Sequence, residues 1–309
     1  MKYSFIIPCY RSEKTINSVI FELIATLKDK KINKYEIILV NDGSPDNTLP
    51  VLIKLNKKYR QIKIINLSKN FGQHSAIIAG LNYTTGDIVT CLDDDGQTPA
   101  SEAFKLINKV DEGYDIVFAK YPEKHHSLFR NFGSHINDLM ANYLINKPKK
   151  LKITSFFSCK NFIVNEVIKY KNPYPYISGL LIRSSNNITN VLINHRSRSF
   201  GKSNYSFSKL IQLWFNGFTA FSIKPLRIAT FSGFFFALIG FSYAIYTIIH
   251  KLTNPFAVLG YASLMSAILF IGGMLMLMLG LIGEYLGRIY IGLNHSPQFV
   301  IKEKIGFND

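Results

Sequence analysis

The sequence is short of cysteine and of acidic residues, and both shortages narrow the class of protein. Its three cysteines, Cys9, Cys91 and Cys159, are odd in number and widely spaced in a chain of 309 residues. Such spacing argues against a disulfide framework and indicates reduced thiols that pack in a core. Asp and Glu total 20 against 36 Lys and Arg, which gives a net charge of +16. This excess predicts a polyanionic partner: nucleic acid, acidic lipid or a phosphorylated substrate.

Two nucleotide-binding signatures are also missing. No Gly-x-Gly-x-x-Gly follows the first apolar run, and no Gly-x-x-x-x-Gly-Lys-Ser/Thr loop occurs. These absences argue against dinucleotide-binding and P-loop folds. The first apolar run, 5–7, is too short for a signal peptide and Pro8 ends it, so we expect none.

Short apolar runs alternate with amphipathic segments through the first 120 residues. The runs predict buried β-strands at 3–7, 36–40, 62–67, 88–92 and 115–119. Helical spacing predicts a helix at 15–27. Small residues predict a helix at 75–82 that packs close to the sheet, and a further helix is expected at 102–110. In the first helix the expected buried face is Ile16, Val19, Ile20, Leu23, Ile24 and Leu27. The alternation predicts a mostly parallel, doubly wound α/β sheet covered on both faces, and 188–194 predicts a further strand at its edge.

The most informative stretch is Asp93-Asp94-Asp95-Gly96-Gln97, which follows the fourth predicted strand. Three adjacent carboxylates repel one another, so they need a counter-charge. Open α/β sheets bind ligands at the carboxyl ends of their strands, where a divalent metal carrying a phosphate would supply that charge. A solvated acidic turn is the alternative. The polar turn 41–48, after the second strand, is a candidate nucleotide site that opens a helix, although alone it is only a good turn sequence.

Basic segments further along the chain suit anions. Arg130 and Ser134 lie four residues apart, on one face of a predicted helix, and with Lys120 they are candidates for a second phosphate site. An ordinary basic surface helix is the alternative. The loop 195–206 is rich in Arg, Lys, Gly and Ser, which suits oxyanions. The segment 210–221 predicts an amphipathic helix in a membrane interface.

The last third of the chain contains the long apolar runs. No Asp, Glu, Lys or Arg occurs between Arg227 and Lys251, or between Lys251 and Glu284. Each run is long enough to cross ~30 Å of hydrocarbon, which predicts a two-helix transmembrane hairpin. Basic residues flank both ends and only Lys251 lies in the turn, so both ends are expected in the cytoplasm. The alternative is a core hairpin of a soluble protein. Five glycines are expected to allow close helix contact, within the hairpin or between copies: Gly272, Gly273, Gly280, Gly283 and Gly287.

Together these motifs resemble family-two glycosyltransferases of the polyprenyl-phosphate type, the group that contains dolichol-phosphate mannose synthase and GtrB-like bacterial enzymes. The resemblance runs nearly end to end, and the order of the motifs before a terminal hairpin is highly specific. The motifs are Phe5-Ile6-Ile7-Pro8-Cys9-Tyr10, Val40-Asn41-Asp42-Gly43-Ser44-Pro45-Asp46, Asn70-Phe71-Gly72, Asp93-Asp94-Asp95-Gly96-Gln97-Thr98-Pro99, Arg198 to Ser206, Phe221-Ser222-Ile223-Lys224-Pro225-Leu226-Arg227 and Gly283-Glu284-Tyr285-Leu286-Gly287-Arg288.

The resemblance implies a GT-A fold that binds a nucleotide-sugar. Pro8, Tyr10 and Asp42 are implied to hold the nucleoside, with Asp42 accepting hydrogen bonds from the base. Asp94, in the middle of its motif, is implied to lie beside the nucleotide-sugar. The family usually has Asn-Glu after the tyrosine, so the acidic contact is expected to move to Glu13 here.

The same resemblance implies that Asp93, Asp95 and Gln97 hold Mg²⁺ or Mn²⁺ on the diphosphate. Asp93, Asp95 and Arg198 are the implied catalytic residues. The implied acceptor-phosphate residues are Lys120, Arg130, Ser134, Arg198 and Ser203. Many relatives carry an acidic residue, the proposed base, before a Phe-Arg pair. The comparable stretch here, 153–160, contains no carboxylate, so no general base is assigned.

The implied activity is an inverting transfer of one sugar to a membrane polyprenyl phosphate such as undecaprenyl phosphate, for cell-envelope biosynthesis at the bacterial cytoplasmic membrane. Another lipid acceptor, a polysaccharide synthase and a non-catalytic membrane scaffold are the alternatives. Membrane lipids and further copies of the chain are expected partners, and nucleic acid is not. The expected segments are a cytoplasmic catalytic domain at 1–204, juxtamembrane helices at 205–227, two transmembrane helices within 228–287 (about 228–250 and 257–283) and a cytoplasmic tail at 288–309.

Overall fold

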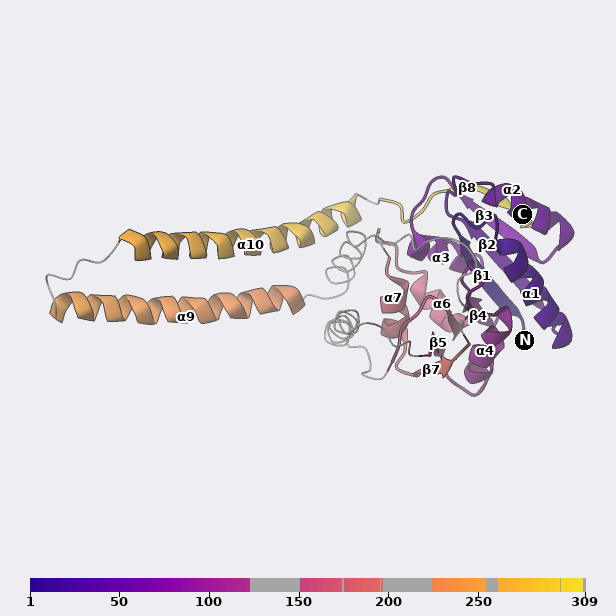
Figure 1. Ribbon diagram of the computed structural model, residues 1–309, viewed down its shortest axis with the longest axis horizontal. Helices are drawn as coiled ribbons and strands as arrows, with labels where there is room; N and C mark the ends of the chain where they lie inside the picture. Colours follow the sequence, from indigo (N-terminus) through magenta and orange to yellow (C-terminus); the bar gives the residue numbers. More distant parts are fainter. Residues whose placement is uncertain are drawn as a thin grey trace. The chain divides into compact units, whose positions relative to one another are not determined.

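The computed structural model describes residues 1–122, 151–173, 175–194, 196, 224–253, 261–294 and 296–307 (Figure 1). The chain divides into two compact units, one made of Met1–Leu210 with His295–Asp309 and the other of Ile211–Asn294. The first unit contains an α/β sheet, and the second contains two long helices. The C-terminal residues therefore belong to the sheet unit, although the helical unit interrupts that unit in the sequence.

An eight-stranded sheet forms the centre of the first unit, in the order β7-β5-β6-β4-β1-β2-β3-β8. Its strands are β1 (Tyr3–Cys9), β2 (Tyr35–Asn41), β3 (Ile62–Leu67), β4 (Ile88–Cys91), β5 (Ile116–Lys120), β6 (Phe157–Lys160), β7 (Ile188–Leu192) and β8 (Ile301–Ile305). The neighbours β4, β1, β2 and β3 run parallel. Almost every side chain of these four strands is buried, as expected of strands that are covered on both faces.

The predicted α/β sheet is confirmed, but it is mixed rather than mostly parallel. β6 lies antiparallel between β4 and β5, and β8 lies antiparallel to β3, so three of the seven pairings are antiparallel. The sequence predicts neither strand, because β6 has only four residues and β8 is the charged run Ile-Lys-Glu-Lys-Ile. Charge of this kind is typical of an edge strand, which must resist pairing with other chains. β7 lies at the other edge, where the sequence predicts an edge strand.

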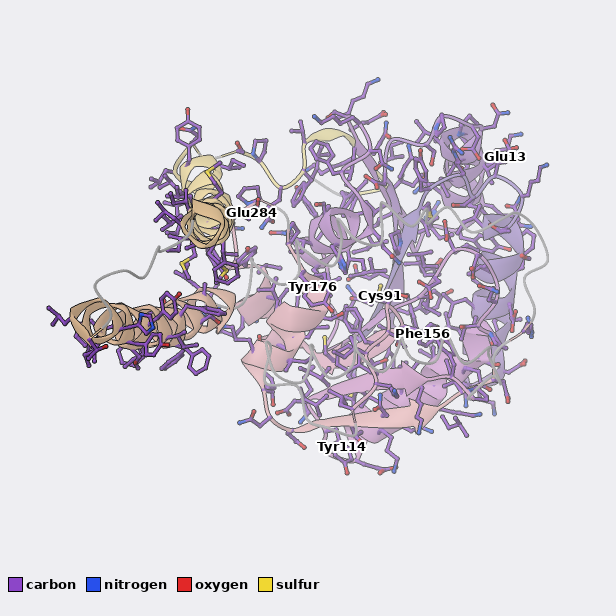
Figure 2. The ribbon with its side chains drawn as sticks, turned by 60° about the vertical axis from the view of Figure 1, so that its left-hand side comes forward. Glu13, Cys91, Tyr114, Phe156, Tyr176 and Glu284 are labelled. Atoms are coloured by element: carbon purple, nitrogen blue, oxygen red, sulfur yellow. The ribbon has the colours of Figure 1, made fainter. Side chains whose placement is uncertain are left out.

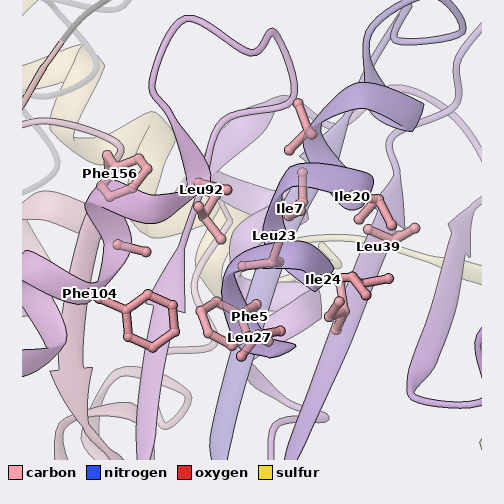
Figure 3. Packing of buried hydrophobic residues seen from close by; sticks show 14 of the residues in the cluster. Phe5, Ile7, Ile20, Leu23, Ile24, Leu27, Leu39, Leu92, Phe104 and Phe156 are labelled. Carbon is pink, nitrogen blue, oxygen red and sulfur yellow. The ribbon is translucent and has the colours of Figure 1, made fainter. Parts of the chain in front are cut away.

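Helices cover both faces of the sheet (Figure 1). One face carries α1 (Ile16–Asp29), α2 (Thr48–Lys58) and α4 (Ala103–Asp111), the last preceded by the single turn η1 (Ala100–Glu102). All six residues predicted for the buried face of α1 are buried. They pack with Phe5, Ile7, Leu92 and Phe104 in one apolar core (Figure 3). Burial of each large apolar side chain contributes ~1.5–3 kcal/mol, so this core supplies much of the stability of the unit.

The opposite face is covered closely by α3 (Gln73–Leu81), next to α6 (Asn161–Val167) and α7 (Ile177–Ser184). A Cβ added at Gly80 would lie 2.6 Å from Cγ2 of Ile6 and 3.2 Å from Cγ2 of Val40. Only glycine fits at this distance, which confirms the predicted small-residue helix. Tyr176, just before α7, packs edge-on against His74 of α3, with 5.3 Å between the ring centroids.

The last residues of the chain return to the sheet. Beyond the pairing of β8 with β3, the Ser68 N–H donates to the carbonyl oxygen of Val300 at 2.9 Å. The Gln298 side chain donates to the carbonyl oxygens of Tyr170 and Asn172 at 2.8 and 2.7 Å. Both ends of the helical unit are therefore attached to one sheet.

The helical unit consists of α9 (Lys224–Thr253) and α10 (Tyr261–Leu293). Among the residues that the structure describes, one helical stretch is long and apolar enough to cross a membrane, the 24 residues Phe270–Leu293 with a mean hydropathy of 1.6. Ala229–Tyr243 is apolar but shorter. The two helices meet where a Cβ added at Gly233 would lie 3.0 Å from Cε of Met278, and where Phe236 packs edge-on against Phe270 at 5.4 Å.

The five glycines of α10 do not make the helix contact that their pattern suggests within the hairpin. Apart from the backbone of the helix itself, a Cβ added at any of them would find no atom of the described residues within 4 Å, and the close approach occurs at Gly233 of α9 instead. Contact between copies of the chain stays a prediction. The predicted interfacial segment 205–223 lies outside the described residues, and α9 begins at Lys224.

A buried carboxylate fastens β1, β2 and β3 together at the end of the sheet opposite the polar loops. Glu36 is 2% exposed, and its Oε1 accepts hydrogen bonds from the Ser4 hydroxyl at 2.7 Å and from the N–H and hydroxyl of Thr85 at 2.7 and 2.9 Å. Its Oε2 pairs with Lys63 at 2.8 Å and with Lys2 at 3.5 Å. Burial alone would raise the pKa of Glu36, but the hydrogen bonds from Lys63, Ser4 and Thr85 outweigh it and lower that pKa to about 2.

Replacing Glu36 by Gln should therefore destabilise the sheet unit. Because the pKa of Glu36 falls from 4.5 to about 2 on folding, its contribution is present above pH 4.5 and is lost as the pH falls through 2. Differential scanning calorimetry of the detergent-solubilised protein at neutral pH should show a loss of about 3 kcal/mol in the free energy of unfolding. An E36Q protein that unfolds at the wild-type temperature would contradict this account of the network.

Candidate active site

Four polar loops lie along one edge of the sheet, because parallel strands deliver the loops that follow them to the same side. β1 and β2 end in register, with Cys9 opposite Asn41, while Ile6 of β1 lies opposite Cys91 at the end of β4. The Asn41 side chain donates to the side chain of Asn66, near the end of β3, at 2.8 Å. The loops after β1, β2, β3 and β4 therefore form one continuous edge.

Asp42 joins the loop after β2 to the loop after β3. Its two carboxylate oxygens accept hydrogen bonds from the N–H groups of Phe71 and Gly72, at 2.7 and 2.9 Å. Burial raises the pKa of Asp42, and these two bonds oppose the rise. The loops also touch at Gly43, which has φ +59° and where an added Cβ would lie 2.3 Å from the carbonyl carbon of Lys69. A carboxylate has lone pairs beyond the two used here, so Asp42 can accept further hydrogen bonds. The implied contact of Asp42 with a base stays a prediction.

Asp94 joins the aspartate loop to the loop after β1. Its Oδ2 accepts hydrogen bonds from the Tyr10 N–H, at 3.1 Å, and from the Ser12 hydroxyl. Burial raises the pKa of Asp94, and both bonds oppose that effect. Between these donors, Arg11 adopts φ 58°, and its N–H donates to the Ser44 hydroxyl at 3.1 Å. Asp94 therefore braces the loop that carries Tyr10, and its implied contact with the nucleotide-sugar stays a prediction.

Asp93 is held from two other segments. Its Oδ1 accepts hydrogen bonds from the Ser155 hydroxyl at 2.8 Å and from the Gln73 side-chain amide at 3.3 Å. Its Oδ2 lies 3.1 Å from the Ser155 hydroxyl. Burial raises the pKa of Asp93 to about 6, the neighbouring carboxylates add to the rise, and the Ser155 and Gln73 hydrogen bonds oppose it. The segment that carries Ser155 leads into β6, opposite the end of β4, where Figure 2 labels Phe156 and Cys91.

Asp95 and Gln97 form the turn that ends the aspartate loop. The Gln97 N–H donates to Oδ1 of Asp95 at 3.0 Å, and Gly96 between them has φ +69°. The carbonyl oxygen of Gln97 accepts a hydrogen bond from the Arg196 N–H at 2.7 Å. The Arg196 guanidinium pairs with both carboxylate oxygens of Glu22 on α1, at 2.9 and 3.1 Å. The chain after β7 is therefore anchored on the aspartate loop.

Lys120 ends β5, and Tyr121 follows it toward the aspartate loop. The Tyr121 hydroxyl lies 3.4 Å from the Thr98 hydroxyl. Burial raises the pKa of Tyr121 to about 12, and the carboxylates of Asp93 and Asp95 add to the rise. The end of β5 therefore lies beside the acidic loop, which is consistent with an anion site that includes Lys120.

The remaining residues that the sequence predicts for the site lie in β1, in the loop that follows it, or outside the described residues. Pro8 lies within β1, opposite Val40. Glu13, labelled in Figure 2, accepts a hydrogen bond from the Asn47 N–H at 3.1 Å, so it holds the residue before α2. Arg130, Ser134, Arg198 and Ser203 lie outside the described residues.

The aspartate loop supplies some, but not all, of the oxygen ligands that a hard divalent cation needs. Among the described residues no group of three or more His, Cys, Asp or Glu side chains could hold a metal by itself. The charge of Asp95 adds to the raised pKa of Asp93, and Gln97, which carries an amide side chain, lies in the same turn as Asp95. Mg²⁺ and similar ions are commonly held by one or two carboxylates together with substrate phosphates. The chemistry of this donor set therefore fits Mg²⁺ or Mn²⁺ if a diphosphate completes the shell.

Several residues that contact the aspartate loop could not be predicted from the sequence. Gln73, Ser155 and Tyr121 reach the aspartate loop from α3, from the segment before β6 and from the end of β5. Serine and glutamine are common in loops, and their contacts here span 62 and 20 residues of chain. Only the pairing of β6 with β4 brings Ser155 to the edge, and the sequence does not predict that strand.

Comparison with known proteins identifies the family. The model of glycosyl transferase family 2 matches residues 4–169, which is more than half of the chain, and that of the GtrB C-terminal hairpin matches residues 224–289. An uncharacterized glycosyltransferase of Synechocystis is 34% identical over 99% of this chain and 96% of its own length. The chain therefore belongs to glycosyl transferase family 2, a family of enzymes, as its motifs predict.

One further relative and one solved structure are also similar to this chain. The undecaprenyl-phosphate 4-deoxy-4-formamido-L-arabinose transferase of Yersinia enterocolitica is 32% identical over 99% of this chain and 94% of its own length. Glucosyl-3-phosphoglycerate synthase from Mycobacterium tuberculosis, crystallised with Mn²⁺, UDP and phosphoglyceric acid, aligns with a TM-score of 0.53 at 18% identity, over 69% of this chain and 74% of that chain. This structural likeness supports the GT-A fold and no more.

The raised pKa of Asp93 leads to a pH-dependent metal affinity. Below pH 6 this carboxyl is protonated in the metal-free protein, and a cation must displace the proton in order to bind. Mn²⁺ affinity, measured by electron paramagnetic resonance, should fall by roughly tenfold per pH unit below that point. Asp93→Asn should bind weakly at every pH. An affinity that is constant between pH 5 and 7, a range that spans the value of about 6, would contradict the role of Asp93.

Proposed function

We propose that the protein transfers one sugar, with inversion, from a nucleotide-sugar to the phosphate of a membrane polyprenyl phosphate. Undecaprenyl phosphate is the acceptor that the named Yersinia relative suggests. Two observations carry the proposal. The Asp93–Gln97 loop lies at the carboxyl edge of the sheet. In the sequence, a pair of apolar helices is inserted between two parts of the same sheet unit. The product would supply the assembly or modification of a bacterial cell-envelope glycan or lipid.

The donor is proposed to bind across the four loops. Tyr10 and Asp42 would contact the nucleoside, and Glu13 and Asp94 would hold the loops around it. Asp93, Asp95 and Gln97 would hold Mg²⁺ or Mn²⁺, which would supply charge stabilisation to the departing diphosphate. Arg198 follows Arg196 by two residues, a length of chain that spans at most ~7 Å. Because Arg196 is anchored on Gln97, this short connection supports the assignment of Arg198 to phosphates; the assignment of Ser203 rests on the motif.

The transfer step needs no general base in this proposal. A phosphate monoester has a second pKa of ~6, so the acceptor is already an oxyanion at neutral pH. Its oxygen would attack the anomeric carbon while the bond from that carbon to the diphosphate oxygen breaks on the opposite side. Lys120, Arg130 and Ser134 would position the acceptor phosphate, which lowers the barrier by orientation. The absence of any carboxylate from 153–160 is consistent with this step.

Two membrane crossings are proposed, because β8 pairs with β3. A single crossing between these strands would leave them on opposite sides of the bilayer, so the number of crossings must be even. α9 has 30 residues and α10 has 33, which correspond to lengths of ~45 and ~50 Å. Both lengths exceed the ~30 Å of hydrocarbon that a span must cross. A pair of crossings also agrees with the basic residues at both ends of the hairpin, which favour a cytoplasmic sheet unit.

Replacing Asp95 by Asn should abolish transfer while leaving the protein folded. The assay combines the purified protein, Mn²⁺, undecaprenyl phosphate and a panel of radiolabelled nucleotide-sugars, and it follows the label into the lipid fraction. The wild-type protein should give a lipid that carries one sugar, and D95N should give less than about 1% of that product, as expected when charge stabilisation of the leaving group is lost. A polymer would favour a polysaccharide synthase, and full activity of D95N would remove the metal assignment.

Cysteine labelling tests the two crossings, since the three native cysteines are buried. Thr253→Cys at the end of α9 should react with a membrane-impermeant maleimide added to intact cells. Lys302→Cys in β8 should react only after the membrane is opened. Equal labelling of the two variants from outside would contradict the proposed sidedness.

A further inference from the structure

We propose that Ser155 is a positioning residue that, with help from Gln73, holds the Asp93 carboxylate in the orientation that accepts the cation. This inference rests on the proposed function, because it assigns a role toward the metal of that site. Neither residue belongs to the aspartate motif. Ser155 lies in the segment just before β6, and Gln73 lies in the first turn of α3. The fold brings both segments to the aspartate loop.

The hydrogen bonds leave one oxygen of Asp93 more available than the other. Oδ1 accepts the shorter Ser155 bond, at 2.8 Å, and the Gln73 bond at 3.3 Å. Among the described residues, Oδ2 contacts only the Ser155 hydroxyl, at the longer distance of 3.1 Å. A hydroxyl donates one hydrogen at a time, and a carboxylate has about four lone-pair sites. The two donors therefore fix the rotation of the carboxylate through Oδ1 and leave Oδ2 to face a ligand.

The chemical type of the donors matters as much as their position. Ser155 and Gln73 are neutral, so they orient the carboxylate without cancelling the charge that attracts a cation. A lysine or arginine in either place would compete with the cation for the same oxygens. Hydrogen-bond partners of metal-binding carboxylates commonly change metal affinity by about 10–100-fold when they are removed.

Ser155 is itself held rigidly on both sides. The Thr154 hydroxyl lies within hydrogen-bond distance of the carbonyl oxygens of Ala119 and Phe156, at 3.1 and 2.9 Å. The Phe156 side chain is fully buried and packs in the same apolar core as Leu92, the residue before Asp93 (Figure 3). The donor and the acceptor are thus fixed by one core, which is the arrangement that precise positioning requires.

The test measures metal binding directly, by equilibrium dialysis of the full-length, detergent-solubilised protein against Mn²⁺. The dialysis is run at neutral pH with Mn²⁺ alone and with each of UDP, GDP, ADP and CDP. Ser155→Ala should weaken Mn²⁺ binding by about tenfold, and Ser155→Thr, which keeps the hydroxyl, should restore most of the affinity. Gln73→Ala removes the other donor and should weaken binding by a smaller factor, since its bond is the longer one at 3.3 Å.

Ser158→Ala is the matched control. Ser158 lies three residues further along, in β6, and its buried hydroxyl pairs with the hydroxyl of Thr90 at 2.8 Å. This variant loses a comparable hydrogen bond, so it should lower the thermal stability and leave Mn²⁺ affinity within twofold of wild type. A structural role alone would make S155A and S158A behave alike.

Two results would overturn the inference, and they have different consequences. If wild type binds Mn²⁺ but S155A and Q73A bind it equally well, the positioning role is wrong and the proposed function stands. If wild type retains no Mn²⁺ under any of these conditions, the metal assignment in the proposed function is wrong as well. Should S155A fail to fold, Ser155→Cys replaces it in the same measurement, because its thiol is of similar size but a weak donor; an unchanged Mn²⁺ affinity in that variant would overturn the role of Ser155.

Discussion

The structure of the polar edge depends on keeping three neighbouring carboxylates within one loop. Each of them has a different partner: Asp93 is held by side chains from two other segments, Asp94 by the loop after β1, and Asp95 by the main chain of its own turn. These hydrogen bonds compensate the three charges separately, although burial and the neighbouring carboxylates still raise the pKa of Asp93. Because the partners come from separate loops, the aspartate loop also fixes those loops relative to one another.

A second constraint connects this edge to the helical unit. The Ser68 N–H donates to the carbonyl oxygen of Val300, the residue before β8. Ser68 begins the loop whose N–H groups bind Asp42, and that loop leads into α3, where Gln73 binds Asp93. The segment that follows α10 therefore pairs, through β8, with the strand whose loop lies at the site.

Much of the sheet unit could be predicted from local pattern. The buried face of α1 and the close packing of α3 follow from side-chain spacing and size, which are local properties. β6 and β8 could not be predicted, because four buried residues or a charged run become strands only through distant partners. The three aspartates were conspicuous in the sequence, whereas Ser155 and Gln73 acquire their role only in three dimensions.

The contrast extends to the candidate site. The sequence motifs predict that Asp42, Asp93 and Asp95 lie at one edge, because parallel strands end on the same side. They do not predict that Asp42 and Asp94 accept hydrogen bonds from main-chain N–H groups. Those contacts depend on the exact path of two loops. Arg130, Ser134, Arg198 and Ser203 lie outside the described residues, so their roles rest on the motifs and on the anchored Arg196.

The most direct test of the central claim is an experimental structure of the protein in a lipid nanodisc with Mn²⁺ and a nucleoside diphosphate. The account predicts the cation bound by Asp93 and Asp95 at the carboxyl edge of the sheet, the diphosphate completing its shell, and both α9 and α10 inside the bilayer. A nucleotide bound elsewhere on the sheet unit, or helices that lie outside the lipid, would contradict it.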